Sequence, residues 1–194
     1  MRERRNIMSE AYNYRELKVE IIHGKEIVMM SPPFSNHNFV KGNIFGLFRT
    51  YLRGKVCVPI SDNQKLVLEE NDGYVVPDFF VVCDRSKIRK DGVYGAPVLV
   101  AEVLSPSTML YDKGVKKDLY QRAGVKEYWI VEPNLKYIEV YLLQDKVYVL
   151  NAIYRMPTDF ESDEDKATVV SEFNVYTFPD LIMDLNDIFE YVMD

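Results

Sequence analysis

The sequence predicts a single α/β domain in which a mixed β-sheet is flanked by helices and extended by β-hairpins. Two apolar runs, YVVPDFFVVCD and APVLVAEVL, are typical of strands that are buried on both faces of a sheet. Amphipathic helical patterns lie before and after these strands, which favours a sheet covered by helices. A length of 194 residues fits one domain, so we expect residues 1–194 to fold as one unit.

The first third of the chain predicts a hairpin, a long helix and two strands. The run LKVEIIHGKEIVMM reads as two short strands joined at His23-Gly24, because glycine tolerates the positive φ of a tight turn. A helix is expected from Ser35 or Asn36 to a stop at Gly54. Its apolar face comprises Phe39, Val40, Ile44, Leu47, Phe48, Tyr51 and Leu52. KVCVPI and QKLVLEE then predict two strands.

The remaining elements alternate in the same way. Between the two buried strands lies a polar loop, DRSKIRKDGVYG, and after the second strand SPST turns the chain. A helix is predicted over 112–123, with Gly124 as its stop. EYWIVEP predicts a strand, and KYIEVYLLQDKVYVL predicts a hairpin about Gln144-Asp145. Beyond these we expect an exposed acidic loop, TDFESDEDKA, a strand near 168–171 and a terminal helix around 185–192.

Charge is distributed unevenly along the chain. Residues 158–194 contain eleven Asp and Glu and one basic residue, Lys166, so this segment has a net charge of −10. Since the whole chain has a net charge of −6, residues 1–157 have a net charge of +4. A basic body with an acidic tail is compatible with contact with a polyanion. The basic N-terminus has no apolar stretch after it and no run approaches the roughly 20 residues of a membrane span, so we expect a cytoplasmic protein without a membrane anchor.

The two cysteines are expected to be reduced, buried thiols. Cys57 and Cys83 each lie in an apolar strand-like run, where a structural thiol is commoner than a disulfide or a pair of metal ligands.

Two buried strands each contain one carboxylate where the pattern calls for an apolar side chain. These are Asp78 and Glu102. A buried ion costs several kcal/mol unless it is compensated, and Mg²⁺ prefers oxygen ligands and retains waters. Two carboxylates and a backbone carbonyl, such as that of Val103, would suffice to hold it. The alternative is structural, with Asp78 capping a turn and Glu102 paired with a lysine.

The helix that follows these strands supplies a cation. In DKGVKKDLYQRAG, Asp112, Lys116 and Tyr120 are spaced one helical turn apart and share a face. A lysine ammonium can stabilise the charge that builds on a phosphate during hydrolysis and can help to activate water. A helix with several lysines is otherwise typical of a solvated surface.

These segments together resemble a known family. PDFFVV, LVAEVLSPST, the Asp112, Lys116 and Tyr120 set and AGVKEYWIVEP are similar to the signature of the Uma-two family, a bacterial group with the restriction-endonuclease-like fold. EIIHGKEIVMMSPP and His37 resemble its N-terminal pattern, so the resemblance covers about residues 17–133.

The resemblance implies an active site of the PD-(D/E)XK type. In it, Asp78 and Glu102 are metal ligands, and a lysine completes the set. The usual lysine position, two residues after the second acid, is Leu104 here, so the role is expected to fall on Lys116, with Lys117 as the less favoured candidate. Glu20 matches an acidic position and is expected either to be a further ligand or water-orienting base, or to face a lysine on a solvated hairpin.

The expected function is that of a Mg²⁺- or Mn²⁺-dependent endonuclease acting on DNA. His37 is a further candidate, with a capping role in the first helical turn as the alternative. A homodimer is plausible because cutting two strands calls for two sites. The competing hypothesis is a noncatalytic nuclease-fold protein that binds DNA or a partner within a defence or mobile-element system.

Overall fold

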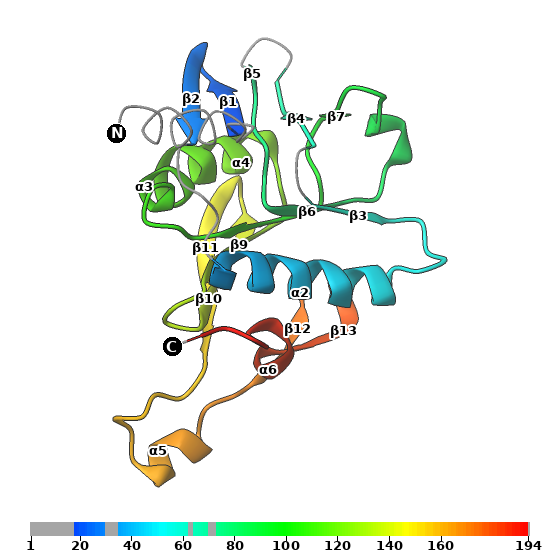
Figure 1. The fold of residues 1–194 in the computed structure, drawn as a ribbon. Coiled ribbons are helices and arrows are strands. Elements are labelled where there is room, and N and C mark those ends of the chain that lie inside the picture. The colour runs from blue at the N-terminus through cyan, green and yellow to red at the C-terminus, as the bar shows by residue number, and fades with distance from the viewer. Residues whose placement is uncertain (1–17, 30–34, 62–63, 70–72, 194) are drawn as a thin grey trace, which may run out of the picture.

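A six-stranded mixed sheet forms the centre of the protein. The computed structural model describes residues 18–29, 35–61, 64–69 and 73–193 (Figure 1). The sheet order is β11-β10-β9-β8-β6-β3, in which β8 and β9 are parallel and the other neighbours are antiparallel. The strands are β3 (Val58–Ser61), β6 (Phe79–Val82), β8 (Leu99–Val103), β9 (Glu127–Glu132), β10 (Tyr137–Gln144) and β11 (Val147–Arg155).

A helical crossover joins the two parallel strands. It consists of α3 (Met109–Tyr111), a π-helical turn at Asp112–Lys116 and α4 (Lys117–Ala123). Gly124 ends it with φ of 85°, as the sequence predicted. π-helical turns are rare and occur frequently at functional sites, so this turn favours a functional role for the segment.

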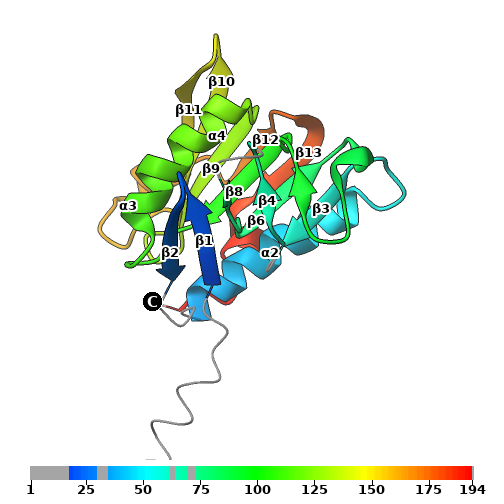
Figure 2. The ribbon, with the colours of Figure 1, turned by 90° about the horizontal axis from the view of Figure 1, so that it is seen from above.

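Each face of the sheet is covered by its own layer (Figures 1 and 2). On one face lie the long helix α2 (Ser35–Tyr51), the hairpin β12 (Glu172–Val175) and β13 (Phe178–Asp184), and α6 (Leu185–Ile188). On the other lie α4 and the small sheets made by β1 (Lys18–Ile22), β2 (Lys25–Met29), β5 (Gly73–Tyr74), β4 (Leu66–Val67) and β7 (Val93–Tyr94). The apolar strands therefore contribute side chains to two hydrophobic cores, one on each face of the sheet.

Most of the predicted elements of the first 155 residues are confirmed. The hairpin turns at His23 and Gly24, which have φ of 51° and 70°. The helix α2 buries Val40, Ile44 and Phe48, as its apolar face predicted, although Phe39 remains 37% exposed. The strand predicted over QKLVLEE shrinks to the two residues of β4. The described part of the chain contains no helix with the length and apolar character to cross a bilayer.

The C-terminal third departs from prediction. The acidic segment includes a short helix, α5 (Asp163–Ala167), which Ser162 caps by accepting a hydrogen bond from the Asp165 N–H. The strand predicted near 168–171 is wrong. Strand β12 starts at Glu172 and pairs with β13, whose alternation of buried Leu181 and Met183 with exposed residues was overlooked.

The cysteines form a disulfide, so the expectation of reduced thiols is wrong. Val58 pairs with Val82 across β3 and β6, and this register places Cys57 directly opposite Cys83. In the sequence each cysteine has the pattern of an isolated core residue. The sequence does not show the strand register that brings the two cysteines together, because that register depends on the tertiary fold.

Reduction of this disulfide is expected to lower the free energy of unfolding by about 3–4 kcal/mol. The bond links residues 26 apart in sequence, and a loop of this length restricts the unfolded chain by that amount. The measurement is urea unfolding with and without dithiothreitol. The Cys57→Ala/Cys83→Ala protein is the control and should be insensitive to the reductant; equal sensitivity would contradict the assignment.

Candidate active site

Asp78, directly before β6, lies opposite Glu102 on the neighbouring strand β8. Residues 79–81 of β6 pair with residues 99–101 of β8, and the same register puts Asp78 across from Glu102. The Asp78 N–H donates to Glu102 Oε2 at 3.2 Å, and the Val103 N–H donates to Asp78 Oδ2 at 3.0 Å. Both side chains are nearly inaccessible. The predicted pairing of two buried carboxylates is therefore present in the structure.

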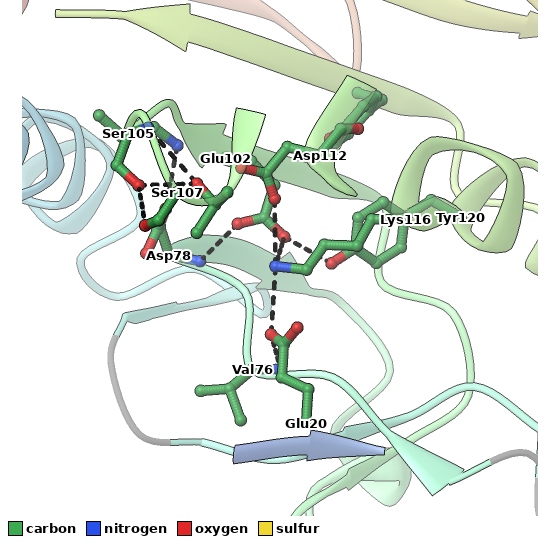
Figure 3. Close-up of polar contacts among 12 residues, drawn as sticks. Glu20, Val76, Asp78, Glu102, Ser105, Ser107, Asp112, Lys116 and Tyr120 are labelled. Carbon is green, nitrogen blue, oxygen red and sulfur yellow. Dashed lines mark hydrogen bonds and ion pairs between the residues drawn. The ribbon is translucent and has the colours of Figure 1, made fainter. Parts of the chain in front are cut away.

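Lys116 lies at the centre of a group of carboxylates (Figure 3). Its Nζ is 3.1 Å from Glu20 Oε1, 3.2 Å from Glu102 Oε1 and 3.2 Å from Asp112 Oδ1. The lysine is only 1% exposed. Glu20, Asp78, Glu102 and Asp112 are hereafter called the carboxylate cluster.

The π-helical turn determines how this helix faces the cluster. Asp112 and Lys116 are its first and last residues and are both buried. One turn later, the Tyr120 hydroxyl donates to Glu102 Oε1 at 2.7 Å. The shared face predicted from the sequence is confirmed, and Asp112, which was noted there without a role, joins the cluster.

Glu20 reaches the cluster from the small sheet above α4. It is completely buried on β1, and its Oε1 also accepts a hydrogen bond from the Val76 N–H at 2.9 Å. The alternative of a solvated hairpin residue is therefore wrong. Since 96 residues separate Glu20 from Lys116 in sequence, only the tertiary fold could reveal this contact.

His37 contacts the cluster from the opposite layer. It lies in the first turn of α2, and its Nε2 is 3.2 Å from Asp78 Oδ2. Its Nδ1 is buried and makes no hydrogen bond with any described residue. His37 therefore positions Asp78 together with the Val103 amide.

Two of the other sequence candidates have different surroundings. Lys117 lies over the Tyr141 ring, 3.5 Å from its centroid, and is not among the ion pairs of the cluster. Leu104, at the position where the superfamily pattern places lysine, is buried in the core on the α4 side of the sheet. The lysine that contacts the carboxylates is therefore Lys116, in the helix after the strand.

Burial and charge shift the pKa values of this site in a consistent direction. Burial alone would lower the pKa of Lys116, but Glu102 and the neighbouring carboxylates outweigh it and hold that pKa well above its usual range. Burial raises the pKa of the Asp112 carboxyl; Lys116 opposes this rise and Asp78 adds to it. Burial also raises the pKa of Tyr120, with Glu102 adding to it. Lys116 is therefore a firmly protonated donor, and Tyr120 stays a neutral phenol.

The chemistry of the cluster suits a divalent cation. One ammonium contacts three carboxylates, and Glu20 Oε2 is buried without a hydrogen-bond partner among the described residues. Within the same residues, no three acidic, His or Cys side chains converge as a ready-made metal site. Mg²⁺ needs only one or two carboxylates together with water and substrate oxygens, so the facing pair Asp78 and Glu102 meets its requirement.

A further buried carboxylate, Glu127, has hydrogen-bond donors for both of its oxygens. Glu127 accepts hydrogen bonds from the Trp129 indole, from the backbone of Tyr176 and Thr177, and from the Thr177 hydroxyl. It anchors the turn of the β12–β13 hairpin to the central sheet. Glu127 is thus structural, whereas the carboxylate cluster gathers several acids around one lysine.

Comparison with known proteins gives one family match. The model of the Uma2 family, described as "Putative restriction endonuclease", matches residues 8–170. Two similar proteins from Synechocystis sp. (strain ATCC 27184 / PCC 6803 / Kazusa) are named "Uncharacterized protein slr1290" and "Uncharacterized protein sll1609". They are 31% and 27% identical over 62% and 64% of this chain. The matches span 64% and 71% of those proteins.

A solved structure shares the fold. The crystal structure of a putative nuclease belonging to DUF820 from Anabaena variabilis ATCC 29413 superposes with a TM-score of 0.69. The alignment covers 92% of this chain and 93% of the other, at 18% sequence identity. The mixed α/β architecture predicted from the sequence is therefore confirmed as a nuclease-like fold.

Proposed function

Because this chain belongs to the Uma2 family, we propose that it is a divalent-metal-dependent nuclease that hydrolyses phosphodiester bonds of DNA at the carboxylate cluster. The observation that carries the proposal is the buried Lys116, which contacts carboxylates from β1, β8 and the π-helical turn. Burying several ions costs free energy, so such a group favours a functional role such as catalysis over a purely structural one.

Within this proposal, Asp78 and Glu102 hold Mg²⁺ or Mn²⁺, with the Val103 carbonyl as a further ligand. The bound cation would supply Lewis-acid polarisation of the scissile phosphate. The His37 imidazole and the Val103 N–H keep the Asp78 carboxylate in place, and the Tyr120 hydroxyl does the same for Glu102. These hydrogen bonds pre-organise the carboxylates before substrate arrives.

Lys116 acts as a hydrogen-bond donor in this scheme. Its raised pKa makes the neutral amine a minor species at neutral pH, so Lys116 is poorly suited to remove a proton from water. It stabilises the negative charge that develops on the phosphate oxygens. Glu20, which lies on the other side of the ammonium, is then the carboxylate that orients the attacking water.

The function is tested by incubating the wild-type protein with supercoiled plasmid, linear duplex and single-stranded DNA in Mg²⁺ or Mn²⁺. Cleavage of DNA that EDTA abolishes is expected. Failure to cut any of these substrates would favour the noncatalytic alternative, a nuclease-fold protein that binds DNA or a partner. The ratio of relaxed to linearised product from the supercoiled plasmid also reports whether one strand or both strands are cut in one binding event. Cutting of both strands is what the expected homodimer predicts.

Mn²⁺ is expected to stabilise the wild-type protein against thermal unfolding. A ligand at about 100 times its Kd adds about 2.7 kcal/mol, which raises Tm by about 5–10 °C for a chain of this size. Asp78→Asn should lose most of this shift, whereas Glu139→Gln, which changes a carboxylate bound to Lys113 outside the cluster, should keep it. Equal shifts for the two variants would contradict metal binding at Asp78.

A further inference from the structure

A pocket rich in basic residues lies at the far end of α2 from the carboxylate cluster. It has a volume of about 310 Å³, and the side chains that line it include Arg49, Arg53, Lys55 and Arg85. Among the described residues, no acidic residue lines it. We call these four residues and the hollow between them the basic pocket. In a chain with a net charge of −6, four cations around one hollow favour a ligand of opposite charge.

The walls of the basic pocket are held in place by the fold. Arg85 Nε and Nη2 donate to the carbonyls of Val56 and Lys55 at 2.8 Å and 3.1 Å, which fastens the 84–87 segment to the loop after α2. Cys57, which also lines the pocket, is bonded to Cys83. The Lys55 ammonium lies 3.2 Å from the centre of the Tyr51 ring. The pocket is thus a preformed hollow.

Two of the four cationic side chains make no contact within the described part of the protein that would explain their charge. Arg49 and Arg53 are exposed, and their side chains make no hydrogen bond, ion pair or ring contact with the described residues. Arg49 lies in the last turn of α2, where a cation also favours the helix dipole. That role accounts for one positive charge but not for four around one hollow. Arginine presents planar paired donors that match phosphate oxygens.

The side chains of α2 carry no negative charge. No Asp or Glu occurs in α2, and Gly42 and Gly46 are exposed on the same face as Arg49, with open space where a side chain would be. His37, at the other end of α2, contacts Asp78 of the cluster. The twelve residues from His37 to Arg49 span about 18 Å at about 1.5 Å per residue.

From this geometry we infer that the basic pocket binds a backbone phosphate of the nucleic acid whose scissile bond lies at the carboxylate cluster. The inference rests on the proposed nuclease function for its choice of ligand. The length of α2 from His37 to Arg49 corresponds to about five base pairs at about 3.4 Å each. The pocket therefore acts as a second anchor that positions the duplex and contributes affinity without reading bases.

The test measures DNA binding in EDTA, so that it does not depend on cleavage. Fluorescence anisotropy follows a labelled duplex of about 30 base pairs across a series of salt concentrations, a length well beyond the spacing of about five base pairs expected from the rise of B-DNA. Arg49→Gln/Arg53→Gln removes two cations and keeps their length. Lys126→Gln/Lys146→Gln removes the same charge from exposed positions elsewhere and is the matched control.

Loss of two phosphate contacts should lower the slope of log K against log salt by about 1.8 and weaken binding at least about tenfold near 0.1 M salt. The control variant should bind like the wild type. Equal binding by the two double variants, or no binding by the wild type, would overturn the inference. If the wild type binds DNA through the pocket but never cuts it, the phosphate anchor is supported and the nuclease assignment fails. If the wild type cuts DNA and Arg49→Gln/Arg53→Gln has the salt slope of the wild type, the nuclease assignment is supported and the phosphate anchor fails.

Discussion

Replacing Lys116 with methionine is expected to lower the free energy of unfolding by about 3–5 kcal/mol at pH 8. The substitution keeps the size of the side chain but leaves Glu20, Glu102 and Asp112 buried without the ammonium that contacts all three. Urea unfolding provides the measurement. Lys117→Met is the matched control, because Lys117 lies over Tyr141 at the partly exposed side of the same helix, and it should change stability by less than about 1 kcal/mol.

The loss in free energy of unfolding caused by Lys116→Met should become smaller as the pH falls. Burial already raises the pKa of Asp112 in the presence of the lysine, and removal of the ammonium raises it further. A carboxyl with a raised pKa binds more protons in the folded state than in the unfolded state. Stability of the variant therefore rises as pH falls from 8 toward the unfolded pKa near 4. A variant within about 1 kcal/mol of wild type at pH 8 would contradict the role of Lys116 as the shared partner.

Glu102→Gln is expected to reduce metal-dependent cleavage at least about a thousandfold. The change removes one negative charge at the centre of the cluster, and loss of metal-based charge stabilisation is worth several kcal/mol of activation free energy. The amide has the same shape, and its oxygen can still accept from Tyr120, but its nitrogen cannot accept from the Asp78 N–H, so circular dichroism must first show that the variant is folded. The observed rate on a linear duplex at saturating Mn²⁺ is the quantity to compare.

A control separates catalysis from general charge effects. Glu139→Gln also removes one negative charge, but from a carboxylate that pairs with Lys113 outside the cluster. It should retain cleavage within about threefold, because this partly buried carboxylate pairs with Lys113 and not with a residue of the cluster. Retention of activity by Glu102→Gln would show that the reacting phosphate lies elsewhere.

Much of the central fold could be predicted from local patterns. The strand that follows Asp78 and the strand that contains Glu102 could be predicted because a lone carboxylate interrupts a continuous apolar run, and their pairing is confirmed. Helical spacing placed Asp112, Lys116 and Tyr120 on one face, which is also confirmed. Both signals arise within short segments, where periodicity reports directly on burial.

Contacts between distant segments were beyond such patterns. Nothing near Glu20 indicates that β1 folds over α4 so that this residue meets Lys116, and nothing near Cys57 gives the register that brings it opposite Cys83. The β12–β13 hairpin was misplaced because its short alternation lies among acidic residues, which favour a loop assignment. In each case the deciding interaction is tertiary.

The most direct test of the nuclease site compares single-turnover cleavage of one duplex by wild type and Asp78→Asn, purified in parallel with Mn²⁺ present. Parallel preparations carry the same trace nucleases, so any difference between them belongs to this chain. The account predicts cutting by the wild type and a rate at least about a thousandfold lower for the variant, because Asp78 is a proposed ligand of the catalytic cation. Equal rates in the two preparations would contradict it.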